Sequence, residues 1–153
     1  MEIKKLIKVL GFEPKENTTD IYIKKYSAVN NYAVEIDFDN KTINFGNKIK
    51  GESKTTQNFS QAENWVVLEC VDRLLTKGYK PEDITLEKVF PSGHGHSGRL
   101  DVFIQKNGKA FLMIECKTFG KEYEKELKNI YKNGGQLFTY FQNDTNTQYL
   151  MLY

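Results

Sequence analysis

Apolar residues near the start of the chain recur with two different periods. Ile3, Leu6, Ile7 and Leu10 have helical spacing, and they predict a short helix that Gly11 ends. After a polar stretch, apolar residues alternate with others over 32–38 and return at 43 and 45, which predicts a β-hairpin turning at 39–41. The polar segment 47–58 is a predicted loop. We expect residues 1–58 to form an N-terminal helix and β-hairpin extension packed on the main body.

Residues 59–153 show a different order of periods. The pattern predicts, in order, a helix at 60–77, strands at 84–90, 99–105 and 110–118, a helix at 121–142 interrupted by Gly134-Gly135, and a strand at 148–153. This order of helix, three strands, helix and strand predicts an α/β core with a mixed sheet of about four strands flanked by helices. Because the chain stops inside an apolar strand, we expect it to be the front fragment of a longer protein. A coding sequence ending at Tyr153 would contradict that.

Composition excludes several classes of protein. The 153 residues are 39% hydrophobic, 13% aromatic and 27% charged, which argues against both a membrane protein and a disordered chain. The net charge of +2 excludes a global polycation, so any surface for DNA must come from local clustering. Lysines interrupt the apolar residues at the N-terminus, and Cys70 and Cys116 lie in apolar segments. We therefore expect a cytoplasmic protein with reduced thiols and no membrane partner.

Two carboxylates and a lysine interrupt strands that are otherwise apolar. Glu115 and Lys117 lie two positions apart, so their side chains point to the same face of the predicted strand. Asp101 lies among apolar residues of the preceding strand, and a short turn near 107–108 brings it close to Glu115. Buried charge is costly without compensation. Glu115 and Lys117 could pair with each other, or the carboxylates could hold a divalent cation.

The second possibility predicts a specific chemistry. Two carboxylates this close repel each other unless a cation lies between them. Oxygen ligands suit Mg²⁺, which binds few protein carboxylates and keeps positions for water and phosphate oxygens. A lysine beside the ion can orient the attacking water or balance charge on the phosphate in the transition state. Asp101, Glu115 and Lys117 together favour phosphodiester hydrolysis.

Asp101 followed by Glu115-Cys116-Lys117 resembles the signature of the PD-(D/E)XK nuclease superfamily, with Leu100 in place of the motif's proline. The order of predicted elements is also similar to its restriction-endonuclease-like core. The resemblance implies that Asp101, Glu115 and the backbone carbonyl of Cys116 are metal ligands and that Lys117 is the catalytic lysine. It implies Mg²⁺, or Mn²⁺ in its place, and DNA as substrate, cut to leave a 5′-phosphate and a 3′-hydroxyl.

Two further features extend this resemblance. Gln136 and Tyr140 lie four positions apart on one helical face and resemble the QxxxY motif of RecB-type nuclease domains and type I restriction R subunits. Glu63, on the inward side of the first helix of the core, resembles the acidic residue of those domains. Residues 59–153 therefore resemble the N-terminal endonuclease module of type I-like restriction-modification enzymes. The resemblance implies a motor or methyltransferase module beyond Tyr153 or in partner subunits.

Each candidate also has a structural alternative. Ser60 and Glu63 fit a helix capping box, which is compatible with a role at the metal site. A buried Glu115–Lys117 ion pair would explain those two residues but would leave Asp101 without a counter-charge. At the level of function, the alternatives are a non-catalytic nucleic-acid-binding or assembly module, and a repair exonuclease or junction resolvase.

Basic and aromatic residues supply the remaining candidates. The predicted helix 121–142 carries a stripe of four lysines, Lys121, Lys125, Lys128 and Lys132. These lysines either follow DNA phosphates or pair with Glu122, Glu124 and Glu126 on a solvated face. Arg99 is a candidate phosphate contact, whereas His94 and His96 alone are a weak zinc signal. Trp65, Phe138 and Phe141 are predicted core residues.

Overall fold

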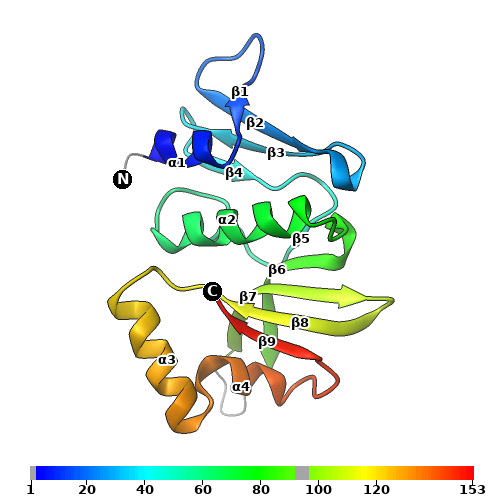
Figure 1. Ribbon diagram of the computed structural model, residues 1–153, viewed down its shortest axis with the longest axis vertical. Coiled ribbons are helices and arrows are strands. Elements are labelled where there is room, and N and C mark those ends of the chain that lie inside the picture. Colours follow the sequence, from blue (N-terminus) through cyan, green and yellow to red (C-terminus); the bar gives the residue numbers. More distant parts are fainter. Residues whose placement is uncertain (1–2, 92–96) are drawn as a thin grey trace. The chain divides into compact units, whose positions relative to one another are not determined.

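The computed structural model describes residues 3–91 and 97–153, and within them it contains four α-helices and two β-sheets (Figure 1). One sheet has four antiparallel strands and the other has five strands of mixed direction, which confirms the α/β class. The chain divides into two compact units. The first unit comprises residues 1–48 and 55–81, and the second comprises residues 49–54 and 82–153.

The first unit contains a helix, the four-stranded sheet and a second helix. Its elements are α1 (Ile3–Val9), β1 (Glu13–Pro14), β2 (Ile21–Tyr26), β3 (Tyr32–Asp37), β4 (Thr42–Asn44) and α2 (Glu63–Thr76). The predicted first helix and the predicted hairpin, β3 with β4, are confirmed. The pattern gave no sign of β2, which pairs with β3 along its whole length, because lysines at 24 and 25 interrupt its apolar residues.

A buried carboxylate joins β2 to α2. Asp72 of α2 accepts hydrogen bonds from Lys24 Nζ at 2.5 Å and from the Tyr26 hydroxyl at 2.8 Å. Burial and then the neighbouring Asp72 carboxylate raise the pKa of Tyr26, so the phenol stays a donor. The boundaries of the two units differ from the boundary between the predicted segments 1–58 and 59–153. The helix expected to open the nuclease core is bonded to the N-terminal sheet through Asp72.

The second unit is built on the five-stranded sheet. Its strands, in order across the sheet, are β5 (Lys50–Gly51), β6 (Ile84–Pro91), β7 (Ser97–Lys106), β8 (Lys109–Glu115) and β9 (Tyr149–Leu152). The meander β6-β7-β8 is antiparallel, and the outer strands β5 and β9 pair in parallel with their neighbours. The four predicted strands are confirmed. The two-residue β5 was missed because it is too short to show a period.

Two helices follow β8, and they are separated where the sequence predicted a break. They are α3 (Lys121–Asn133) and α4 (Gly135–Phe141). Gly134 and Gly135 both have positive φ angles, +88° and +57°. A Cβ on Gly135 would collide with the Glu126 carboxylate, and the positive φ at this position also favours glycine. Helix α4 packs on β7, β8 and β9, where its Leu137 and Tyr140 join the core around Phe103 and Met113.

No helix in the described part of the chain is long and apolar enough to cross a membrane.

We predict that Glu52 attaches the segment after β5 to β6 in a pH-dependent way. Burial raises the pKa of Glu52, but hydrogen bonds from Lys88 Nζ and the Val89 amide, both 2.8 Å, outweigh burial and hold the pKa below its usual range. The stability from Glu52 is therefore present above the carboxyl's unfolded pKa and is lost as the pH falls through its lower folded pKa. Glu52→Gln should lower the free energy of unfolding at pH 7, and the difference should shrink in acid. Denaturant unfolding at a series of pH values measures this. The exposed Glu13→Gln is the control, and an equal effect at both positions would contradict the prediction.

Candidate functional site

The β7-β8 hairpin brings the two candidate carboxylates together. Val102 pairs with Ile114, so the adjacent residues Asp101 and Glu115 lie across from each other at the end of β8. The tight turn uses positive φ angles at Asn107 and Gly108, 52° and 73°. The predicted hairpin and the predicted proximity of the two acids are both observed.

Asp101 is fixed by the backbone that follows Glu115. Its Oδ2 accepts a hydrogen bond from the amide of Cys116 at 2.7 Å, and the residue is half-buried. The carboxylate of β7 is thereby fixed beside the segment Glu115-Cys116-Lys117 at the end of β8. Hydrogen bonds from a backbone amide to a carboxylate are charge-assisted and stronger than neutral ones. Asp101 therefore has a hydrogen-bond partner in the protein. The Glu115–Lys117 ion pair considered in the sequence analysis would have left Asp101 without one.

Glu115 and Lys117 form a buried ion pair. Lys117 Nζ lies 2.7 Å from Glu115 Oε1, and the two side chains are 14% and 3% exposed. The backbone on both sides is held by Tyr153, whose amide donates to the Glu115 carbonyl and whose carbonyl accepts from the Lys117 amide, both at 2.9 Å. The pairing considered from the sequence is therefore present. An amine lies next to Glu115, one of the two acids, as the hydrolytic interpretation also requires.

Tyr140 reaches this site from α4. The residue is 3% exposed, and its hydroxyl donates to the carbonyl of Arg99 at 2.8 Å. Burial, and then the charges of Glu115 and Asp101, raise the pKa of Tyr140. The hydroxyl thus stays protonated near both carboxylates, and it holds β7 two residues before Asp101. Gly98 makes room for the ring, because a Cβ there would lie 2.6 Å from Tyr140 Cε1. No pattern in the sequence singled out Gly98.

Gln136, the other half of the predicted motif, is arranged differently. Gln136 is exposed in the first turn of α4, and its backbone amide donates a hydrogen bond to Glu126 Oε1 at 2.9 Å. Glu126 is only 5% exposed and also accepts from Asn129 Nδ2 at 3.2 Å. Of the two alternatives for the lysine stripe, pairing of the lysines with Glu126 is therefore not observed among the described residues. Glu126 is buried because its carboxylate satisfies the start of α4, and a role of Gln136 at the site stays a prediction.

Glu63 belongs to the first unit, and its part in the site also stays a prediction. It is the first residue of α2, and the residue before it, Ala62, is the N-cap without a side-chain hydrogen bond. The capping box with Ser60 as N-cap, one of the alternatives for Glu63, is not formed, because the helix begins two residues later than the box requires. Asn58 Oδ1 instead accepts the amide of Ser60 at 2.9 Å.

Arg99, the expected phosphate contact, is exposed but has protein partners. Its Nη1 lies 3.3 Å from Ser53 Oγ and 3.8 Å from Glu87 Oε1. Glu87 is a buried acid that the sequence analysis did not single out, and its φ of 53° is rare for a residue other than glycine. Glu87 lies within a strand pattern in the sequence, and that pattern does not indicate a left-handed conformation. Part of the charge of Arg99 is therefore balanced within the second unit.

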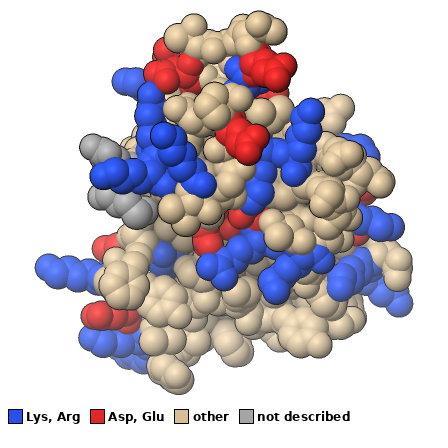
Figure 2. All heavy atoms as spheres, turned by 45° about the horizontal axis from the view of Figure 1, so that its top comes forward, with Lys and Arg blue, Asp and Glu red and all other residues tan. Residues whose placement is uncertain are grey.

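The four lysines of α3 are all exposed, as predicted for either of their roles. Over the face seen in Figure 2, basic side chains are interspersed with acidic ones, in keeping with the small net charge. Trp65 is buried as expected and Phe141 is half-buried, but Phe138 is 47% exposed and is not a core residue. Phe138 is exposed because α4 turns Leu137 and Tyr140 towards the sheet instead.

The chemistry of the donors limits what metal the site could take. Among the described residues, no group of three or more His, Cys, Asp and Glu side chains is arranged to hold an ion. His94 and His96 lie outside the described residues. Two carboxylates with backbone carbonyls nearby fit Mg²⁺, which commonly uses one or two carboxylates together with substrate oxygens and water. They do not fit a closed zinc site.

No protein-family model matches the chain, and no curated protein matches it.

We predict that Tyr140→Phe destabilises the second unit although the ring is retained. The change removes the hydrogen bond to the Arg99 carbonyl, which should lower the free energy of unfolding by about 1 kcal/mol. Tyr131→Phe is the matched control, because Tyr131 is 83% exposed. Chemical denaturation of both variants measures the difference. Equal stability of the two variants would show that the Tyr140 hydroxyl does not hold β7.

Proposed function

We propose that the second unit is a Mg²⁺-dependent deoxyribonuclease domain of the PD-(D/E)XK type. The observation that carries the proposal is the 2.7 Å hydrogen bond between Asp101 and the Cys116 amide. It joins one acid to the peptide segment that holds the other acid and the lysine. A pair of acids with an adjacent amine is the set of groups that metal-assisted hydrolysis of a phosphodiester needs.

Asp101, Glu115 and the Cys116 carbonyl would hold the metal ion. When bound, Mg²⁺ would supply positive charge against the phosphate and make a water molecule more acidic. Lys117 is held within 2.7 Å of Glu115, so its ammonium can neutralise that carboxylate before DNA binds. With DNA bound, the same ammonium can orient the attacking water or stabilise charge on the phosphate. The low exposure of both side chains keeps water from weakening these interactions.

The setting that fits this domain is a restriction-modification system of the type I kind. The exposed lysines of α3 and the small net charge suit a nuclease that another module brings to DNA. A motor or methyltransferase module, in the same protein or in a partner subunit, would supply recognition of the DNA sequence. A cytoplasmic location follows from the same proposal. A repair exonuclease or junction resolvase would use the same groups and would differ in its partner modules.

One observation favours a non-catalytic module with the same fold. The Glu115–Lys117 ion pair and the Asp101–Cys116 hydrogen bond give all three side chains a partner within the protein. A buried ion pair can serve structure alone, although its net contribution to stability is often small. Such a module would bind DNA without cutting it.

We predict that Lys117→Ala abolishes cleavage of DNA. Supercoiled plasmid is incubated with the protein and Mg²⁺, and nicked and linear products are measured over time. Removal of the ammonium should lower the rate by about 100-fold or more, as does loss of one charge-stabilising donor in other hydrolases. Asp101→Asn should have a similar effect, whereas Lys109→Ala, at the exposed start of β8, should leave the rate unchanged.

Three outcomes would count against the proposal. Cleavage that survives Lys117→Ala would remove this residue from the mechanism, and cleavage in EDTA would contradict the need for metal. DNA binding by the wild-type protein without any cleavage would favour the non-catalytic module. Denaturant unfolding of each variant separates a chemical effect from loss of the buried ion pair.

A further inference from the structure

Two aromatic side chains of the second unit project into solvent, one just after the proposed site and one near the far end of α3. Phe119, in the segment between β8 and α3, is 101% exposed, and Tyr131 near the end of α3 is 83% exposed. Neither ring contacts another ring or a cation among the residues the structure describes. Scattered exposed apolar residues are common, so exposure alone says little. The charges around these rings make them informative.

Four lysines occupy the same helix as Tyr131, and all are exposed. Successive lysines lie three or four positions apart, so they share one side of α3, and Tyr131 follows Lys128 by three positions. Within the described parts of the chain, the side chain of none of the four forms a hydrogen bond or an ion pair. Of the three acids of the helix, Glu122 and Glu124 are exposed and offset part of this charge, whereas Glu126 is buried and bonded to the start of α4. We call this surface the α3 face: Phe119, Tyr131, Lys121, Lys125, Lys128 and Lys132.

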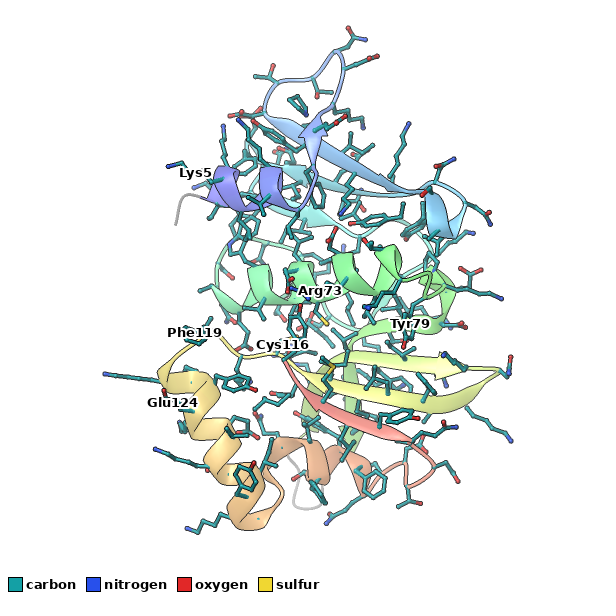
Figure 3. The ribbon with its side chains drawn as sticks, viewed as in Figure 1. Lys5, Arg73, Tyr79, Cys116, Phe119 and Glu124 are labelled. Carbon is teal, nitrogen blue, oxygen red and sulfur yellow. The ribbon has the colours of Figure 1, made fainter. Side chains whose placement is uncertain are left out.

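The α3 face begins next to the proposed catalytic lysine. Figure 3 shows Cys116 at the end of β8 and Phe119 further along the same connecting segment, before α3. Phe119 follows Lys117 by two residues, so their Cα atoms are at most about 7.6 Å apart. The 13 residues of α3 extend the surface by about 20 Å from that point. A strand lying along α3 would therefore lead directly to Glu115 and Lys117.

We infer that the α3 face binds single-stranded DNA and delivers it to the site of the second unit. Surfaces that bind single strands combine cations that follow the phosphates with aromatic rings on which unpaired bases stack. In a duplex the faces of the bases are covered by their neighbours, so Phe119 and Tyr131 would gain nothing from it. Lysines bind phosphates as point charges and read no base. The inference rests on the proposed function for the cutting step and adds the form of DNA that the α3 face binds.

Binding is tested without metal, so that cleavage plays no part. Fluorescence anisotropy of a labelled oligothymidylate, in EDTA, should show tighter binding than a duplex of the same length. Phe119→Ala and Tyr131→Ala should each weaken binding of the single strand by about 5- to 150-fold, the range for loss of one stacked base. Val9→Ala is the control, because Val9 is an 85% exposed apolar residue of the first unit.

Two further measurements report on the contacts themselves. Phe119→Trp should keep the affinity, and the fluorescence of the introduced indole should be quenched when the oligonucleotide binds. Lys125→Gln with Lys128→Gln should reduce the slope of log affinity against log salt by roughly 0.7 for each lysine that contacts a phosphate. Lys109→Gln, an exposed lysine outside the α3 face, should leave the slope unchanged.

The outcomes separate this inference from the proposed function. Stronger binding of the duplex, or equal losses in Phe119→Ala and Val9→Ala, would overturn the inference even if plasmid is cut. An unquenched indole with retained affinity would show that position 119 does not stack on a base, and would also overturn it. Single-strand binding that depends on Phe119, without any cleavage in Mg²⁺, would support the surface and refute the nuclease.

Discussion

The second unit depends on a contact between a charged side chain and a peptide group, the 2.7 Å hydrogen bond from the Cys116 amide to Asp101. It lies where β8 has ended, so the Cys116 amide is free to bond with a side chain. By binding that amide, Asp101 fixes the direction in which the chain leaves the sheet. The ion pair of Glu115 and Lys117 then forms on a backbone that Tyr153 holds from β9. The positions of all three polar side chains thus follow from the end of β8 and from its two neighbours, the middle of β7 and the end of β9.

Helix α4, which packs on the sheet, also helps to hold β7 near Asp101. Its start is satisfied by the buried Glu126 of α3, and its Tyr140 bonds to β7 two residues before Asp101. Two glycines allow this arrangement for steric reasons: Gly135 leaves space for the Glu126 carboxylate, and Gly98 leaves space for the Tyr140 ring. A buried carboxylate that caps one helix therefore helps to position the strand that carries another carboxylate. The polar groups of the unit act as one connected set.

Burial of charge has different consequences in the two units. In the first unit, Asp72 receives hydrogen bonds from Lys24 and Tyr26, which join a strand to a helix. In the second unit, Glu115 and Lys117 pair at the end of β8, and the half-buried Asp101 lies across the hairpin from Glu115. Exposure does not distinguish the two ion pairs, because the side chains of Asp72 and Lys24 are 8% and 19% exposed and those of Glu115 and Lys117 are 3% and 14% exposed. The second acid beside the pair makes the second unit the location of the candidate site.

The sequence by itself determined the elements with strong periods and the hairpin that brings Asp101 to Glu115, because alternation and a tight turn are local properties. It also located the break at Gly134-Gly135. Only the tertiary structure decided which acids are partnered. Glu126 became a helix cap, Glu87 took a left-handed conformation, and Asp101 found an amide on another strand. It also decided that α2 is bonded to the N-terminal sheet, through Asp72. These outcomes depend on residues distant in the chain, and the energy of a buried charge is set by such neighbours rather than by its own segment.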